Sequence, residues 1–103
     1  MSKITRTVLL LGGVLGLSAL AVPAFADNVS YCRDYARDAV HQSRAARDHE
    51  RCHHFIRDNP ARFSEDYNGH YTSCMSNYGS GFNAAENQAR IDALNDCIPD
   101  HHW

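Results

Sequence analysis

Apolar and small residues recur at helical spacing along residues 30–51, and charged side chains occupy most of the other positions. The stripe expected to face inward consists of Tyr31, Cys32, Tyr35, Ala36, Ala39 and Val40. Ser30 precedes this stripe and is a suitable N-cap, because its hydroxyl can accept a hydrogen bond from a backbone N–H of the first turn. The pattern predicts one amphipathic helix of about five turns.

A turn separates this helix from a second one. The tripeptide Asp58-Asn59-Pro60 favours a turn, and Ser64 followed by two acidic residues is typical of a helix start. The apolar and aromatic stripe of the second helix is formed by Tyr67, Tyr71, Cys74, Met75 and Tyr78. We therefore expect a second amphipathic helix that begins near Ser64 and ends near Tyr78.

Two glycines divide the second helix from a third. Gly79 and Gly81 make continued helix costly, and Asn83 with Glu86 has the spacing of a capping box, although Asn replaces the usual Ser or Thr. The third helix is expected over residues 84–97 and to end before Pro99. Its inward residues are expected to be Ile91, Leu94 and Ile98. The chain is thus predicted to be all-α, a small bundle or hairpin of two to three helices.

Residues 1–26 have the composition of a secretory signal peptide. Basic residues come first, an uncharged apolar run follows, and the triplet Ala24-Phe25-Ala26 precedes the expected cleavage site. Cleavage between Ala26 and Asp27 would leave one helical disulfide domain, residues 27–103, without stable membrane insertion. An uncleaved membrane anchor is the alternative, although the uncharged run is barely long enough to cross about 30 Å of hydrocarbon. We expect a periplasmic or secreted protein.

Without the signal peptide the chain is acidic and contains no lysine. Residues 27–103 contain eight arginines and twelve Asp and Glu residues, which gives a formal net charge of −4. Because phosphate backbones are bound by clustered positive charge, no nucleic-acid partner is expected. Large aliphatic residues are few, and domains this short are usually stabilised by disulfides or metal ions.

Four cysteines provide such links in an exported chain. No CxxC pair is present, so redox exchange, a zinc ribbon and haem attachment are disfavoured. A continuous first helix would hold Cys32 and Cys52 about 30 Å apart, which excludes a bond between them. The similar intervals 32–52 and 74–97 favour two antiparallel arms joined by Cys32–Cys97 and Cys52–Cys74. The parallel pairing, Cys32–Cys74 with Cys52–Cys97, is the alternative.

Histidines near the end of the first helix are candidate metal ligands. His49 and His53 lie four residues apart, which places both rings on one helix face, and His54 follows directly. A Cys52–Cys74 bond would bring His70 close to them, so that a Cu, Zn or Ni ion could be bound by three or four imidazoles. The alternative is a set of solvated histidines favoured by the C-terminal helix dipole.

The sequence also resembles a group of small exported four-cysteine helical proteins of alphaproteobacteria. The shared segments are CxxYAxxAVxQ from Cys32, RWSxDYxxHYxWC ending at Cys74, and ExxxRxxxLxxC from Glu86 to Cys97. Phe63 and Ser73 stand where that pattern has Trp. The resemblance implies a secreted helical disulfide domain and no particular activity. His70 falls inside the pattern, whereas His49, His53 and His54 do not.

No local motif indicates an enzyme, because none of the serines lies in a G-x-S-x-G nucleophile elbow and the cysteines are expected to be oxidised. We therefore expect an exported, non-catalytic protein of unknown specific role, without a cofactor, that acts through binding or as an envelope component. Its partner would be another protein or the envelope, contacted through an aromatic-rich surface. The alternative function is periplasmic binding of Cu, Zn or Ni through the histidine cluster.

Overall fold

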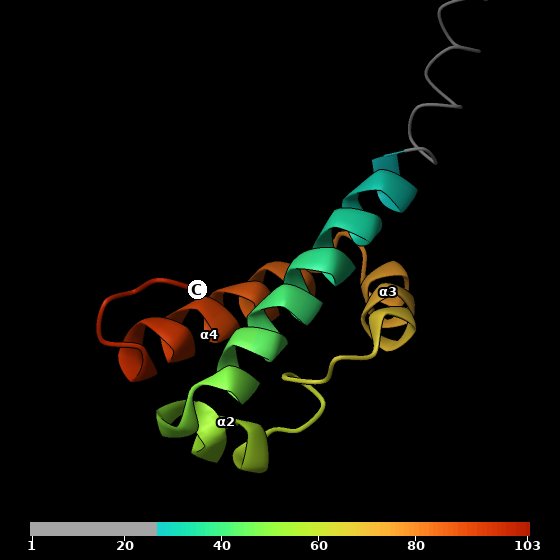
Figure 1. Ribbon diagram of the computed structural model, residues 1–103. Helices are drawn as coiled ribbons and strands as arrows, with labels where there is room; N and C mark the ends of the chain where they lie inside the picture. Colours follow the sequence, from blue (N-terminus) through green and yellow to red (C-terminus); the bar gives the residue numbers. More distant parts are fainter. Residues whose placement is uncertain (1–26) are drawn as a thin grey trace, which may run out of the picture. The chain divides into compact units, whose positions relative to one another are not determined.

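A computed structural model describes residues 27–103, and every regular element in this range is helical (Figure 1). A first helix covers residues 27–48 and is followed by the short 3₁₀ helix η1 (Glu50–Cys52), α2 (His53–Asp58), α3 (Tyr67–Ser76) and α4 (Phe82–Cys97). The predicted all-α, disulfide-linked fold is confirmed. Residues 31–103 form one compact unit. The predicted signal peptide and its cleavage site at Ala26 lie outside the described residues.

The first helix is shifted toward the N-terminus relative to the prediction. It already includes residues 27–30, so Ser30 is not its N-cap, and it ends at residue 48 rather than 51. His49 is extended, with φ −118° and ψ 112°, and the Cys52 backbone N–H then donates to the His49 carbonyl at 2.8 Å. This break turns the chain away from the helix axis and places Cys52 in η1.

The predicted inward stripe of the first helix is largely correct. Cys32, Ala36 and Ala39 are fully buried, whereas Tyr31 at the start of the stripe is exposed. Burial continues toward the C-terminal end of the helix through polar and small residues. These further buried residues are Gln42, Ser43, Ala45 and Ala46. A helix this rich in alanine lets its neighbours approach closely but contributes little apolar area.

A connector over residues 59–66 joins α2 to α3. The predicted turn is confirmed, because Asn59 ends α2 and its side-chain Oδ1 accepts a hydrogen bond from the Arg62 backbone N–H at 3.2 Å. Phe63 in this connector is buried. The helix α3 begins at Tyr67, later than predicted, and Asp66 is its N-cap. Ser64 stays in the connector, where its Oγ accepts a hydrogen bond from the Asp66 backbone N–H.

The break between α3 and α4 occurs where the glycines predicted it. Gly79 and Gly81 have φ of +84° and +87°, a backbone region that residues with a β-carbon rarely adopt. Gly81 is the N-cap of α4, so the predicted capping box of Asn83 and Glu86 is not formed. Instead, Asn83 is buried and its Nδ2 donates to the Cys74 carbonyl at 3.0 Å.

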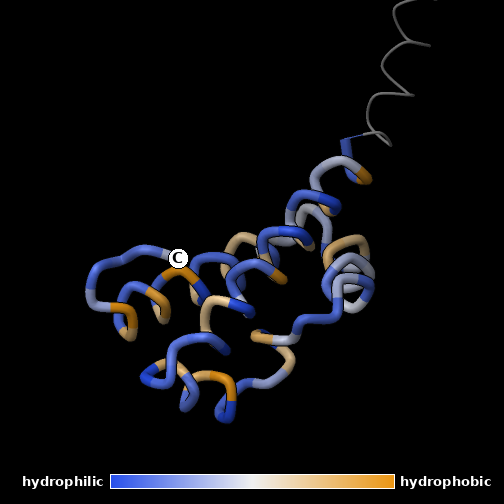
Figure 2. Tube along the Cα trace, in the orientation of Figure 1, coloured by the Kyte–Doolittle hydropathy of each residue, from blue (hydrophilic) through white to orange (hydrophobic). Residues whose placement is uncertain are grey.

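Two small apolar clusters form the core, and each contains one disulfide. The larger lies where the end of the first helix meets α4 and includes Phe63, Leu94 and Ile98. The smaller consists of Cys32, Tyr35 and Cys74, with Tyr71 and Met75 packed against it. Hydrophilic positions dominate the rest of the trace (Figure 2). Of the predicted inward residues on α4, Leu94 and Ile98 are fully buried and Ile91 is half-buried.

The disulfides join Cys32 to Cys74 and Cys52 to Cys97, with Cα–Cα distances of 5.5 and 5.2 Å. The favoured antiparallel pairing, Cys32–Cys97 with Cys52–Cys74, is therefore wrong, and the parallel alternative is correct. The parallel pairing results from the course of the chain after Cys52. The helix α2 and the connector carry the chain back along the first helix, so that α3 packs near Cys32 (Figure 1). Within residues 27–103 no helix is long and apolar enough to cross a membrane.

Candidate functional site

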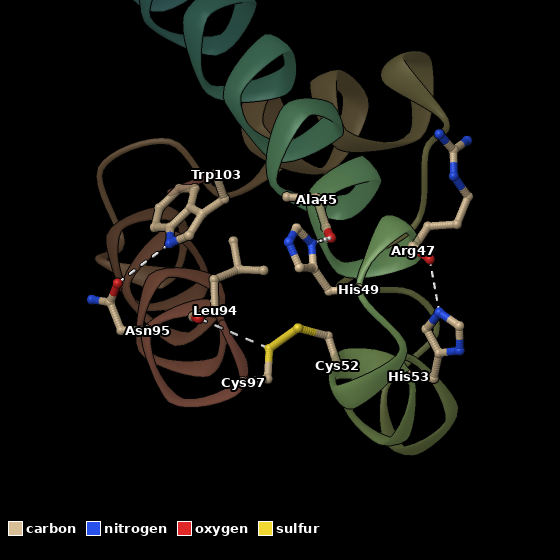
Figure 3. Close-up of a disulfide and its surroundings, with 9 residues drawn as sticks. All are labelled: Ala45, Arg47, His49, Cys52, His53, Leu94, Asn95, Cys97 and Trp103. Carbon is tan, nitrogen blue, oxygen red and sulfur yellow. Dashed lines mark hydrogen bonds between the residues drawn. A yellow bond between two sulfur atoms is a disulfide. The ribbon is translucent and has the colours of Figure 1, made fainter. Parts of the chain in front are cut away.

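The histidines expected to bind a metal ion are bonded to separate parts of the backbone. His49 donates from Nδ1 to the Ala45 carbonyl at 2.8 Å, and His53 donates from Nε2 to the Arg47 carbonyl at 2.7 Å (Figure 3). His54 packs on the ring of Phe55, with 4.0 Å between ring centroids.

His70 does not join these three residues. Its approach to them depended on a Cys52–Cys74 bond, but Cys74 is bonded to Cys32 instead. Among the described residues no three His, Cys, Asp or Glu side chains gather in a way that could hold a metal ion. Binding of Cu, Zn or Ni stays a prediction from sequence, without a preformed site in this part of the chain.

A different site lies between the first helix, the connector, α3 and α4. A cavity of about 460 Å³ opens there. The side chains that give it its chemistry are Tyr35, Arg62, His70, Ser73, Glu86 and Arg90. We call it the Arg90 cavity. It falls within the range of about 300–1,000 Å³ that is typical of small-molecule sites.

Arg90 is the most unusual residue of this cavity, because a charged side chain in the middle of α4 is only 1% exposed. Its Nε donates to Gln42 Oε1 at 2.7 Å, and its Nη1 donates to the Arg62 carbonyl at 3.3 Å. The guanidinium also lies over the ring of Tyr35, 5.1 Å from the centroid, which is a favourable cation–π geometry. These contacts hold the guanidinium in one orientation.

Gln42 is itself held in place. Its Nε2 donates to Asn87 Oδ1 at 3.0 Å, which leaves Oε1 free to accept from Arg90. The amide therefore links the first helix to two positions on α4. Such a pair of bonds fixes the Arg90 side chain before any ligand arrives.

Arg90 nevertheless lacks a complete set of partners. Its Nη2 is buried and donates to no acceptor in the described part of the chain. Its Nε and Nη1 donate to an amide oxygen and a backbone carbonyl, which are both uncharged. Burial of an ion removes its hydration, which costs several kcal/mol unless an opposite charge and hydrogen bonds replace the water. The structure thus holds a buried cation whose hydrogen-bond partners among the described residues are uncharged.

The nearby carboxylate of Glu86 is already engaged by Arg62. Arg62 donates from Nε and Nη2 to the two Glu86 oxygens at 3.1 and 2.9 Å, a bidentate pair at the cavity wall. The hydrogen bond from Arg62 lowers the pKa of Glu86, with smaller contributions from the positive charges of Arg62 and Arg90. The same bond raises the pKa of Arg62. With two guanidinium groups and one carboxylate, this wall carries an excess positive charge.

His70 is buried on the α3 side of the cavity, edge-on to Tyr35. Its Nε2 lies 2.7 Å from the Ser64 carbonyl. Because a carbonyl oxygen can only accept, Nε2 carries the proton of this hydrogen bond, which fixes the orientation of the ring. The cavity therefore combines guanidinium donors on the Arg90 side with an imidazole ring on the α3 side.

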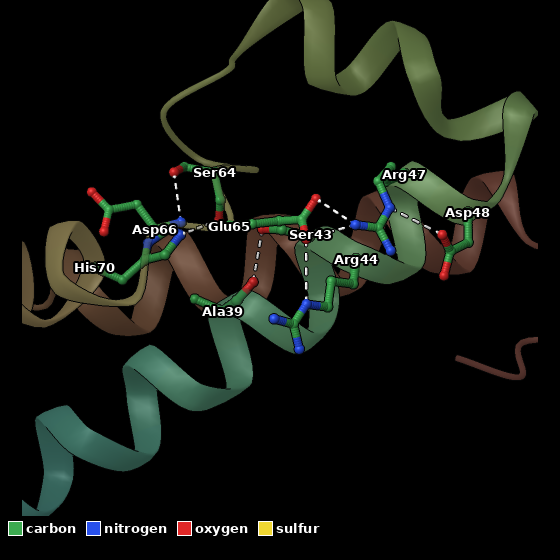
Figure 4. Close-up of polar contacts among 9 residues, drawn as sticks. All are labelled: Ala39, Ser43, Arg44, Arg47, Asp48, Ser64, Glu65, Asp66 and His70. Carbon is green, nitrogen blue, oxygen red and sulfur yellow. Dashed lines mark hydrogen bonds and ion pairs between the residues drawn. The ribbon is translucent and has the colours of Figure 1, made fainter.

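An exposed charge cluster fastens the connector beside the cavity (Figure 4). Arg47 donates from Nη1 to both carboxylate oxygens of Glu65, at 2.9 and 3.1 Å, and Arg44 donates from Nε to Oε1 at 3.3 Å. Exposed ion pairs contribute little individually, about 0–1 kcal/mol. Here two of them share one carboxylate, and they hold the connector residues on the first helix.

Sequence reasoning missed Arg90, Arg62 and Tyr35 as site residues. One signal was available, because Arg90 precedes Leu94 by four residues and therefore lies on the inward stripe of the third predicted helix. An arginine at such a position needs a buried partner or a ligand. The partner Arg62 could not be found in this way, because its distance from α4 depends on the course of the connector.

Comparison with known proteins adds no further information about this site. No protein family, curated protein or solved structure matches the chain.

Proposed function

We propose that the protein is an exported, non-catalytic binding protein that holds a small organic anion in the Arg90 cavity. The observation that carries this proposal is the buried Arg90 guanidinium, which is 1% exposed and whose Nη2 has no hydrogen-bond partner among residues 27–103. A ligand carboxylate or phosphate group would supply the missing acceptor and neutralise the excess positive charge. Charge-assisted bonds of this kind are among the strongest hydrogen bonds in proteins.

The remaining cavity residues narrow the chemistry of the ligand. The imidazole of His70 and the hydroxyl of Ser73 also line the cavity, so the anion should carry a further polar group such as a hydroxyl or an amine. Phe82 and the Tyr35 ring provide apolar contact area. A hydroxy acid or an amino acid with a nonpolar part would match these features.

Binding requires a local movement. The Nη2 of Arg90 is closed to water in the free protein, so an anion can reach it only after a side chain of the cavity wall changes rotamer. Side-chain rearrangements of this size are common when proteins bind ligands. Phe82 is suited to such a change, because it lines the cavity and its side chain is exposed.

Two disulfides support a location in the periplasm or outside the cell, since such bonds persist in oxidising compartments.

Isothermal titration calorimetry on the oxidised, exported protein tests the proposal. The probes are citrate, lactate, phenyllactate and inorganic phosphate, with glycerol as a neutral control. We expect saturable binding of at least one organic anion and none of glycerol. Lack of saturable heat with every anion would overturn the proposal.

Two variants locate the site. Arg90→Lys keeps the charge but loses the planar fork, and is expected to weaken binding roughly tenfold or more. Ser73→Trp adds an indole at the cavity wall and is expected to abolish binding while the helical circular dichroism is kept. Tyr67→Ala, at an exposed position that does not line the cavity, is the matched control. Equal affinity of all three variants would place the ligand elsewhere.

A further inference from the structure

A second, smaller hollow lies where the loop between α3 and α4 meets the start of the first helix. Its volume is about 300 Å³. The residues that line it are Tyr31, Tyr78, Gly79, Gly81, Asn83 and Ala84. We call it the tyrosine cup. It shares no lining residue with the Arg90 cavity, and none of its lining side chains is charged.

Two exposed tyrosines form the wall of the cup. Tyr31 and Tyr78 are each 42% exposed, and their rings meet edge to face with 5.5 Å between centroids and an interplanar angle of 79°. Tyr31 also stacks on the buried Tyr35, with 6.4 Å between centroids. Large aromatic side chains left in solvent beside a hollow are typical of a binding surface.

Glycine backbone also lines the cup. Gly79 and Gly81 have positive φ, and a β-carbon added at either would meet no heavy atom within 4 Å, so the space beside them is open. The loop is nevertheless well braced. Ser80 donates from its backbone N–H and from Oγ to the Asn77 carbonyl, at 3.1 and 2.7 Å. The cup is therefore an ordered surface with an accessible backbone.

Asn83 supplies an independent indication of a ligand. Its side chain is 4% exposed, and its Nδ2 donates to the Cys74 carbonyl, which fixes the orientation of the amide. The remaining oxygen, Oδ1, is buried and accepts no hydrogen bond within the described residues. Buried acceptors without a donor are rare in native proteins. Because Asn83 lines the cup, a hydroxyl bound there would supply the missing donor after a small displacement of the wall.

We propose that the tyrosine cup binds a neutral saccharide unit. The C–H groups of a pyranose ring pack on the electron-rich faces of aromatic rings, and its hydroxyls can donate to Asn83 and to exposed backbone carbonyls. Among the described residues no cationic side chain lines the cup, so a phosphate or nucleic acid would find no counter-charge there. No carboxylate lines it either, so an organic cation would be held by the rings alone.

The test is an NMR titration of the oxidised, ¹⁵N-labelled protein with chitotriose and with maltotriose. Saturable shifts are expected for the backbone amides of Gly79, Gly81 and Asn83. Either sugar would support the proposal, and a preference would identify the class of glycan. Absence of saturable shifts at these amides with both sugars would overturn it.

Variants of exposed tyrosines provide the controls, because they leave the core intact. Tyr78→Ala and Tyr31→Ala are each expected to weaken saccharide binding roughly tenfold. Tyr67→Ala removes an equally exposed tyrosine outside the cup and should leave the affinity unchanged. Equal affinities for Tyr78→Ala and Tyr67→Ala would contradict the proposed location. Because the two hollows share no lining residue, a saccharide result is independent of anion binding at Arg90.

Discussion

Removal of the Cys52–Cys97 disulfide should cost a large share of the stability of the domain. The bond joins residues 45 positions apart, and the loop-entropy relation assigns a closed loop of this length about 4 kcal/mol. Domains of this size have a total stability of about 4–11 kcal/mol, so this loss is a third or more of the total. We therefore expect Cys52→Ala/Cys97→Ala to be strongly destabilised relative to the parent protein.

Urea unfolding followed by far-ultraviolet circular dichroism measures this loss. A change of about 4 kcal/mol corresponds to a fall of roughly 2–4 M in the urea midpoint for a small domain. The matched variant Cys32→Ala/Cys74→Ala removes a bond with a separation of 42 residues, so its entropic loss should be nearly equal. A midpoint within about 0.5 M of the parent protein would refute the reasoning, since the disulfide would then contribute less than about 1 kcal/mol.

The first of these variants and a third, Cys32→Ala/Cys97→Ala, test the pairing itself. In Cys52→Ala/Cys97→Ala the remaining cysteines, Cys32 and Cys74, are bonded to each other, so the variant purified from an oxidising compartment should contain no thiol that reacts with a disulfide reagent. In Cys32→Ala/Cys97→Ala the remaining cysteines, Cys52 and Cys74, have both lost their native partners. This variant should contain either about two reactive thiols per molecule or a non-native disulfide. The opposite pattern would falsify the parallel pairing.

Three further predictions concern single positions. Arg62 lowers the pKa of Glu86 in the folded protein. The stabilisation from this pair is therefore complete above the unfolded-state pKa of about 4.3 and is lost as the pH falls through the folded-state pKa. Glu86→Gln should make the free energy of unfolding less dependent on pH in this acid range. Leu94→Ala, at a fully buried position, should cost about 2–5 kcal/mol in urea unfolding. Gly81→Ala should lower the thermal midpoint, because a φ of +87° costs a residue with a β-carbon about 1–2 kcal/mol, and an unchanged midpoint would contradict this strain.

The helices and their breaks could be predicted because they depend on local sequence. Burial of Ala36 and Ala39 follows from helical periodicity, and the breaks at Asn59 and at Gly79 follow from residues that favour turns or positive φ. The ends of the helices were predicted less accurately. Ser64 was expected to start a helix, but it accepts a hydrogen bond in the connector instead.

The disulfide pairing could not be predicted because it depends on where the connector leads. The similar spacing of the cysteines favours antiparallel arms only if the chain does not return after Cys52, but α2 and the connector make it return. The expected approach of His70 to His53 and His54 is wrong for the same reason, since it required Cys74 beside Cys52. The hydrogen-bond partners of Arg90 are equally non-local, because Gln42 and Arg90 are 48 residues apart.

The central claim is that Arg90 is the anchor for a small anion, and side-chain NMR of arginine tests it most directly. Arginine-labelled protein would be titrated with the organic anion that gives the largest calorimetric signal, or with citrate if none does. We expect a saturable shift of the Arg90 guanidinium resonances, with smaller changes at Arg62, which is already paired with Glu86. Unchanged Arg90 resonances at saturating anion would rule out anion binding at this residue.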